Sequence, residues 1–221
     1  MDVLRGPFEP NFSELPEKIP LFPLSGALLL PGGKLPLNIF EPRYLAMVQN
    51  AFFSPSRLIG MIQVNKNNVS NKNKNLYEIG CAGRISNFSE TEDGRMLITL
   101  SGVSRFNLLN YETLKDGYIE ANVSWKNFDL DLNLDKSKID REKLLENLKI
   151  YFKIKGFSVD WDHLIKSENE KLVTTLSMIC PFDISEKQAL LEAKDLSERS
   201  KLLSTILFMS THDDKKNNAK H

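Results

Sequence analysis

The sequence predicts an α+β fold in which a β-rich N-terminal part with one helix is followed by a C-terminal helical bundle. Up to residue 125, short apolar runs alternate with glycines, prolines and Asp-Gly pairs, a pattern typical of strands and hairpins. After residue 126, apolar residues recur every three or four positions, which is the helical period. We therefore expect a β subdomain over residues 19–125 and a helical subdomain over residues 138–209.

Three segments without a regular apolar pattern flank these parts. Residues 1–18 combine prolines with acidic residues, and we expect an irregular N-terminal arm there. Residues 126–137 carry Asp129 and Asp131 in a segment that mixes charged, polar and apolar residues, which favours an acidic linker between the two parts. Residues 210–221 are polar and are expected to be a disordered tail.

The β subdomain is expected to begin with two short strands and a helix. Gly32-Gly33 predicts a turn between strands at Ala27–Leu30 and Leu35–Ile39. The helix is expected at Glu41–Phe53, because Pro42 suits the first helical position and apolar residues follow at helical spacing. The strands expected next are Leu58–Val64, Leu76–Ser89, Arg95–Leu100, Val103–Tyr111 and Tyr118–Trp125.

Turn signals separate these later strands. Asp93-Gly94 and Asp116-Gly117 are strong hairpin signals, and the Asn/Lys-rich run Asn65–Asn75 predicts a flexible hairpin tip. Phe88 and Phe106 lie in predicted strands, and we expect both in the core.

The helical subdomain is expected to contain five helices. Gly156 is expected to cap the first, Pro181 separates the third from the fourth, and Ser185 with Gln188 predicts a capping box. The expected ranges are Ile139–Lys155, Asp160–Ser167, Glu170–Cys180, Ser185–Ala193 and Leu196–Met209.

Composition argues against several classes of partner. The 221 residues include 29 Lys+Arg and 29 Asp+Glu, so zero net charge gives no global attraction to nucleic acid or to anionic membranes. No apolar run approaches the roughly 20 residues that span a bilayer, and the N-terminus lacks a signal-peptide core. We expect a cytoplasmic protein with no membrane partner.

Catalytic and metal-binding patterns are weak. The chain has neither a GxxxxGK[ST] phosphate loop nor a G-x-S-x-G elbow, and its two cysteines form no CxxC pair. A hydrolase remains conceivable only if Cys81 or Cys180 lay beside His163 in an open cleft, whereas a buried structural role is the commoner fate of cysteine. We expect no enzyme activity, no catalytic residue, no metal site and no cofactor.

The segment Phe40-Glu41-Pro42-Arg43-Tyr44 supplies the candidate site residues, which are Phe40, Glu41, Arg43 and Tyr44. A cation in the first helical turn opposes the helix dipole, so Arg43 is expected to pair with Glu41 or with a distant carboxylate. One interpretation is a buried ion pair that fixes the helix on the sheet. The other is a binding hot spot for a protein partner.

The stretch Ile19–Tyr44 resembles the opening of the Lon-protease N-terminal domain family, also called the Lon substrate-binding domain. Further blocks match this family in order: Leu58–Gln63, Tyr77–Ile85, Leu97–Gly102, Ile179–Phe182 and Glu186–Glu192. The Asn/Lys-rich run at 65–75 departs from the family pattern and looks like an insertion.

The resemblance implies a PUA-like β pseudo-barrel with one helix, followed by a helical bundle, over residues 19–209. In full-length Lon this region precedes the ATPase and helps to recognise protein substrates. We therefore expect a stand-alone, non-catalytic protein- or peptide-binding module that acts as an adaptor or regulator of proteolysis. Its expected partners are unfolded or misfolded protein segments and a protease. RNA binding is the alternative, since PUA-like barrels also host RNA sites, although the zero net charge disfavours it.

Overall fold

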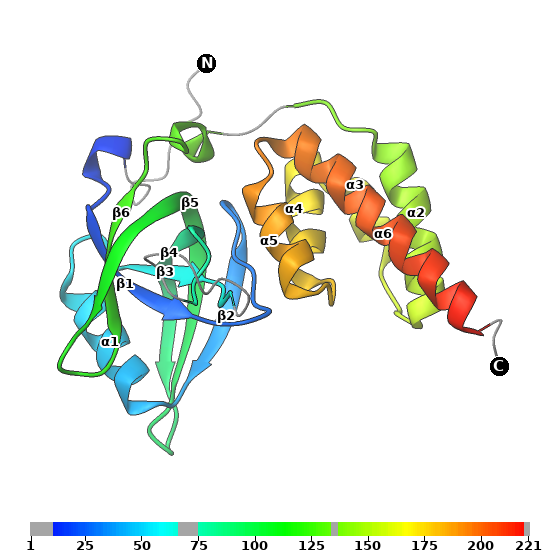
Figure 1. The fold of residues 1–221 in the computed structure, drawn as a ribbon. Helices are drawn as coiled ribbons and strands as arrows, with labels where there is room; N and C mark the ends of the chain where they lie inside the picture. Colours follow the sequence, from blue (N-terminus) through cyan, green and yellow to red (C-terminus); the bar gives the residue numbers. More distant parts are fainter. Residues whose placement is uncertain (1–10, 66–74, 134–136, 219–221) are drawn as a thin grey trace. The chain divides into compact units, whose positions relative to one another are not determined.

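The computed structural model describes residues 11–65, 75–133 and 137–218, apart from the side chains of His163 and residues 213–218. The chain forms two compact units, Met1–Asn133 and Leu134–His221. Within the described ranges, the strands and α1 belong to the N-terminal unit and helices α2 to α6 to the C-terminal unit (Figure 1).

The N-terminal unit is built on a six-stranded sheet that closes on itself (Figure 1). The strand order is β2-β5-β4-β3-β1-β6, and β6 pairs again with β5, so five strands form a ring and β2 extends it. Neighbouring strands are antiparallel except for β1 and β3. This topology confirms the predicted β pseudo-barrel. The strands are β1 (Lys18–Pro23), β2 (Lys34–Ile39), β3 (Leu58–Ile62), β4 (Ile79–Glu90), β5 (Met96–Thr113) and β6 (Ile119–Ser124).

The barrel core is centred on Phe106, which is fully buried as predicted. Its ring meets Trp125 edge to face, with the centroids 5.9 Å apart. Gly80 leaves room for this ring, because a Cβ on Gly80 would lie 2.4 Å from a Phe106 ring carbon. Trp125 also donates its indole N–H to the Pro16 carbonyl at 2.9 Å, which ties the start of the unit to its last strand.

Helix α1 (Pro42–Phe53) covers one side of the sheet. Its first residue is Pro42, as the sequence predicted, and Glu41, which was expected inside the helix, is the N-cap. The helix buries Tyr44, Met47, Val48 and Ala51. On a neighbouring face, the Asn50 amide donates to the Tyr118 hydroxyl at 3.0 Å, which fixes the helix against the β5–β6 hairpin.

The region around Gly102 differs from the prediction. Residues Ala27–Leu30 form no strand, and the predicted strands Arg95–Leu100 and Val103–Tyr111 are one continuous strand, β5. Gly102 does not turn the chain, because its N–H donates to the Gly33 carbonyl at 2.8 Å and its own carbonyl accepts from Gly32 at 3.0 Å. A Cβ at Gly102 would lie 2.0 Å from the Leu30 carbonyl oxygen, so this glycine permits close backbone approach rather than a turn.

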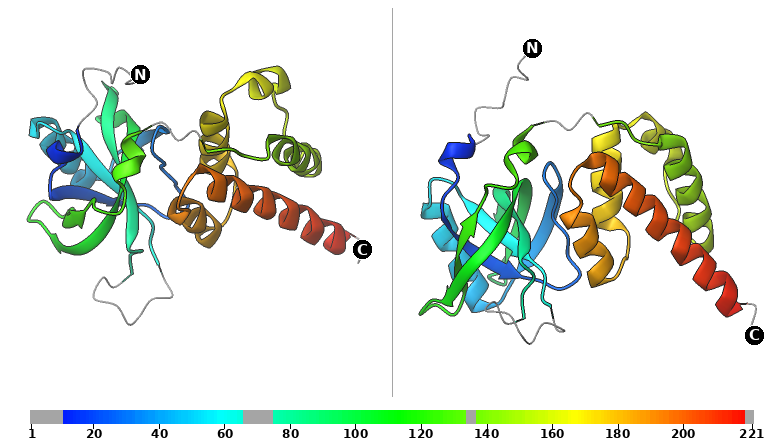
Figure 2. Two further views of the ribbon diagram at one scale, coloured as in Figure 1. Left: turned by 90° about the horizontal axis from the view of Figure 1, so that it is seen from above. Right: turned by 45° about the horizontal axis from the view of Figure 1, so that its top comes forward.

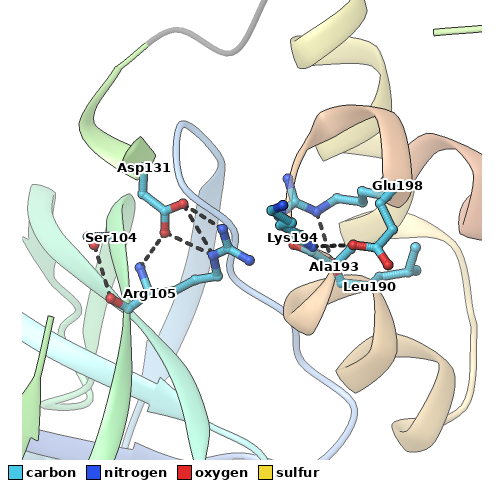
Figure 3. A network of polar contacts seen from close by, with 8 residues as sticks. Ser104, Arg105, Asp131, Leu190, Ala193, Lys194 and Glu198 are labelled. Carbon is cyan, nitrogen blue, oxygen red and sulfur yellow. Dashed lines mark hydrogen bonds and ion pairs between the residues drawn. The ribbon is translucent and has the colours of Figure 1, made fainter. Parts of the chain in front are cut away.

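The structure also differs from the prediction at the acidic residues of the expected linker. Residues Asp129–Leu132 form a short 3₁₀ helix, η2, and Asp131 is paired with Arg105 of β5 in the interior of the unit (Figure 3). The Arg105 guanidinium also lies 4.7 Å from the centroid of the Phe128 ring. A buried ion pair holds η2 against the barrel, so the chain as far as Asn133 belongs to the N-terminal unit.

The ends of the β subdomain differ from their expected bounds in smaller ways. A 3₁₀ turn, η1 (Phe12–Glu14), and the first residue of β1 fall within the expected N-terminal arm, of which residues 1–10 lie outside the described ranges. The predicted hairpin tip at Asn65–Asn75 is described only at its two ends, where Val64 and Leu76 form a β-bridge.

The C-terminal unit is a helical bundle, in which α2 packs along α6 (Figure 2). Its interior holds an aromatic cluster formed by Tyr151, Phe152 and Phe182, with ring centroids 6.0 to 6.1 Å from that of Tyr151. Gly156 ends α2 in the left-handed conformation, as predicted. The helices are α2 (Arg141–Lys155), α3 (Trp161–Lys166), α4 (Asn169–Ile179), α5 (Ile184–Glu192) and α6 (Leu196–Asn218).

Two helix ends differ from the prediction. The capping box of α5 is formed by Asp183 and Glu186 instead of Ser185 and Gln188, and Gln188 is buried, with its amide donating to Glu192. Helix α6 continues to Asn218, through most of the segment 210–221 that was expected to be disordered.

Candidate functional site

The four residues predicted from the sequence lie at the junction of β2 and α1. The Arg43 guanidinium pairs with the Glu41 carboxylate, with an Nη2–Oε2 distance of 2.7 Å. Pairing with Glu41 was one of the two predicted arrangements. The interpretation as a buried ion pair, one of the two that the sequence left open, is wrong, since both side chains are about half exposed, at 50% and 43%. An exposed pair of this kind contributes little to stability, so it does not fix α1 on the sheet.

Tyr44, and not Arg43, anchors the start of α1 to the sheet. Its side chain is buried, and its ring centroid lies 4.3 Å from that of Phe22 on β1. The Arg43 guanidinium lies 4.5 Å from the Tyr44 ring centroid. Burial raises the pKa of the Tyr44 phenol, and the Arg43 charge opposes that rise. Of the four residues, Phe40 alone is both apolar and well exposed, with the Arg95 guanidinium 5.9 Å from its ring centroid.

A second group of aromatic side chains lies where the other end of α1 meets β4. Phe52 stands edge to face on Phe88, with the ring centroids 4.9 Å apart. Phe53, the last residue of α1, is 88% exposed, and Phe88 is 38% exposed. We call Phe52, Phe53 and Phe88 the phenylalanine surface.

The sequence analysis did not find this surface, because it placed Phe88 in the core. The register of β4 shifts between Ile85 and Asn87, and a bulge of this kind reverses the expected alternation of inward and outward side chains. The adjacent phenylalanines Phe52 and Phe53 were the one sequence signal that could have indicated this surface. Helical spacing can bury only one of two adjacent side chains on a single face.

The C-terminal unit has a groove of about 700 Å³ between α2 and α6. Ile150 and Phe208 supply its apolar lining, and the Asn147 amide closes part of its floor by donating to the Ser204 hydroxyl at 2.8 Å. Two lysines and two acidic residues also line the groove, so it favours neither charge. These residues are Asp140, Lys143, Glu146 and Lys201.

The thiols are poorly placed for nucleophilic chemistry. Cys81 and Cys180 lie in different units, and each is at most 2% exposed. Burial raises the pKa of the Cys180 thiol to about 12, and the charge of Lys187 offsets only part of that effect. The His163 side chain lies outside the described part of the chain. Within that part, no group of three or more His, Cys, Asp or Glu side chains is arranged to hold a metal ion.

The described helices also include none that is both long and apolar enough to cross a membrane.

Comparison with known proteins finds one family across most of the chain. The model of the ATP-dependent protease La (LON) substrate-binding domain matches residues 18–208. The Lon protease of Parabacteroides distasonis is 29% identical over 208 residues, which cover 90% of this chain and 25% of that protein. Lon protease 1 of Bdellovibrio bacteriovorus is 27% identical over 200 residues, covering 85% and 24%. The chain thus spans about a quarter of the length of these curated relatives.

Two solved structures share the fold. The Lon N-terminal domain protein from Xanthomonas campestris superposes with a TM-score of 0.59 at 23% identity, covering 84% of this chain and 96% of that one. The N-terminal domain of a Mycobacterium avium complex Lon protease gives a TM-score of 0.58 at 14% identity, covering 89% and 98%. The family match, the curated relatives and the shared fold agree with the resemblance seen in the sequence blocks. The chain belongs to the Lon substrate-binding domain family.

Proposed function

We propose that this domain binds exposed apolar segments of unfolded or misfolded proteins at the phenylalanine surface. The observation that carries the proposal is the exposure of Phe53 on α1 and of Phe88 on β4, in a unit whose other large apolar side chains are mostly buried. An aromatic ring loses little conformational freedom on binding and buries a large apolar area, so exposed rings are frequent hot spots in protein interfaces.

The surface is also held in place. Phe52 is half-buried on α1 and contacts Phe88 edge to face, so the helix supports the ring on the strand. Its immediate neighbours on β4, Asn87 and Ser89, are uncharged. A preformed apolar surface with neutral neighbours suits apolar segments of many sequences, because it adds no charge requirement.

The proposed role is a non-catalytic one in proteolysis. Family membership supports substrate recognition, since the matched region of Lon is its substrate-binding domain and not its catalytic part. A domain of this type would deliver captured segments to a protease, as an adaptor or regulator.

The proposal is tested with reduced, carboxymethylated α-lactalbumin, a permanently unfolded protein, as a fluorescent probe. We expect F53A and F88A each to weaken binding by about fivefold or more, a loss of about 1 kcal/mol that fewer than a third of interface side chains reach. L109A is the matched control, because Leu109 is 55% exposed on β5 of the same unit, and it should bind as the wild type does. F40A shows whether the β2–α1 junction extends the surface.

Equal binding by F53A, F88A and the wild type would refute the assignment. Folded α-lactalbumin should not compete with the probe. A labelled RNA homopolymer is the second probe, and tighter retention of RNA than of the unfolded protein would favour the RNA-binding alternative instead.

A further inference from the structure

The strand β4 has a partner on both sides along only part of its length. On the side away from β5, strand β3 pairs with Cys81–Arg84, and the Ile85 N–H donates to the Arg57 carbonyl at 3.1 Å. Beyond Ile85, no strand in the described part of the chain pairs with that side of β4. Residues Ser86 to Glu90 are all exposed.

The register shows which backbone groups face the open side. The Thr91 N–H donates to the Arg95 carbonyl at 3.0 Å and closes the β4–β5 hairpin, and Glu90 stands opposite Met96 in the next pair. Hydrogen-bonded and non-hydrogen-bonded pairs alternate along an antiparallel ladder. The N–H and C=O groups of Phe88 and Glu90 therefore point away from β5. The described residues provide no hydrogen-bond partner for them.

Among the described residues, the free edge on β2 is protected against a further strand, whereas the edge on β4 is not. Strand β2 lies at the end of the sheet and carries Lys34 and Pro36, both common devices against the addition of a further strand. The segment Ile85–Glu90 contains neither lysine nor proline. Its single charge is on Glu90, at the very end of the strand.

We propose that extended protein segments bind by adding a strand to the Phe88–Glu90 edge of β4, a mode that rests on the proposed function. The bound backbone would exchange hydrogen bonds with Phe88 and Glu90. Its side chains would alternate between the face of Phe88 and Phe52 and the face of Asn87 and Ser89. The preferred segment is thus extended, rich in β-branched or aromatic residues at every second position, and free of proline.

The first experiment measures amide hydrogen exchange of the full chain with a synthetic peptide of about ten residues that alternates valine and threonine. We expect slower exchange at the Phe88 and Glu90 amides when the peptide binds, and no change at Asn87 and Ser89, whose amides already face β5. Unchanged exchange at Phe88 and Glu90 under saturating peptide would overturn strand addition.

The second experiment uses the matched variants E90P and E90Q. Proline removes the outward N–H of residue 90 without removing a bond to β5, whereas glutamine removes only the charge. We expect E90P to weaken peptide binding about tenfold and E90Q to bind as the wild type does, a difference that corresponds to about 1.4 kcal/mol. Trp125 emission, in a W161F background, verifies that the N-terminal unit of both variants is folded. Equal binding by the two folded variants contradicts the proposal.

The outcomes separate this proposal from the one on which it rests. One outcome is that F53A and F88A lose binding, whereas the peptide leaves amide exchange at Phe88 and Glu90 of the wild type unchanged. The phenylalanine surface then binds protein without strand addition. If F53A and F88A bind normally, the proposed function itself fails. A concentration-dependent dimer that E90P abolishes, in the absence of peptide binding, would assign the edge to a second copy of the chain and overturn the proposal.

Discussion

Arg105 and Asp131 form an ion pair in which each side chain is less than one-tenth exposed. The Asp131 carboxylate accepts from the Arg105 backbone N–H at 2.9 Å, from Nε at 2.9 Å and from Nη2 at 2.7 Å. This arrangement gives the carboxylate several charge-assisted hydrogen bonds in place of water. It attaches η2 to the middle of β5 and completes the N-terminal unit.

Removal of one partner of this pair should destabilise the N-terminal unit strongly. We expect D131N and R105M to lower the free energy of unfolding by about 3–5 kcal/mol, because each leaves an uncompensated buried group. Urea unfolding followed by Trp125 emission, in a W161F background, reports the N-terminal unit alone. R95Q breaks the exposed Arg95–Asp93 pair and should change the transition very little. A loss no larger than that of R95Q would show that the buried pair is not structural.

Gly102 should tolerate no side chain. We expect G102A to cost about 3 kcal/mol or more, since its Cβ would meet the Leu30 carbonyl oxygen, a backbone atom that cannot move aside. G94A is the matched control, because Gly94 has a positive φ of 78° but open space around it, and should cost about 1 kcal/mol. Thermal unfolding compares the two variants. Equal costs would mean that the β5 backbone can shift away from Leu30.

Asp183 should contribute to the stability of α5 in a pH-dependent way. Hydrogen bonds from the Glu186 N–H and the Ser185 hydroxyl lower the pKa of this carboxyl. Its contribution is therefore complete above the ordinary aspartate pKa, about 3.9, and is lost as the pH falls through the lowered value. We expect D183A to cost about 1 kcal/mol at pH 7, and D183N, which can still cap, to cost less.

Urea unfolding monitored by circular dichroism at pH 7 and below pH 4 tests this linkage. The difference between the wild type and D183A should shrink as the pH falls. S185A removes a hydroxyl donor but keeps the cap, and it should cost a few tenths of a kcal/mol. A larger loss in S185A than in D183A would favour the capping box that the sequence suggested.

The Cys180 thiol should be unreactive across the neutral range. Because burial raises its pKa to about 12, only about 0.1% of the Cys180 thiol is ionised even at pH 9, and we expect its alkylation in a C81A variant to stay very slow from pH 7 to 9. An unfolded cysteine, with a pKa of about 8.5, is largely ionised at pH 9 and should react several hundredfold faster there. The same shift means that the folded state keeps the thiol proton that the unfolded state loses. The associated stabilisation is present below the unfolded pKa and disappears as the pH rises towards 12. Rapid alkylation of the native protein at pH 8 would contradict the buried position.

Local signals predicted much of the fold. Pro42, Gly156 and the Asp93-Gly94 turn each act over a few residues, and each lies where the sequence placed it. The family motifs supplied the order of the parts, and the closed sheet confirmed the pseudo-barrel. The helical period of the apolar residues predicted that α2 to α6 exist, although it did not predict where each helix begins and ends.

The failures arose where distant residues decide the conformation. In the sequence, Gly102 resembles a turn glycine. In the fold, the Leu30 carbonyl lies in the space that a side chain at residue 102 would occupy. Arg105 and Asp131 are 26 residues apart, and no local pattern announces their contact. The bulge near Ser86 exposes Phe88 and creates the surface proposed here. The candidate site was therefore only partly predictable: Phe40, chosen from the sequence, stays a prediction, and the phenylalanine surface depends on the fold.

The closure of the barrel has a consequence for synthesis of the protein. Strand β1 pairs with β6, with Lys18 opposite Asn122, so the first strand gains one of its two neighbours only from the last. Until Ser124 has left the ribosome, the buried Ile19 and Leu21 of β1 lack the β6 residues that pair with them. Pairings this distant along the chain are slow to form and leave apolar strands exposed meanwhile. We therefore expect the nascent N-terminal unit to remain a client of chaperones until its last strand emerges, and then to fold in a single step.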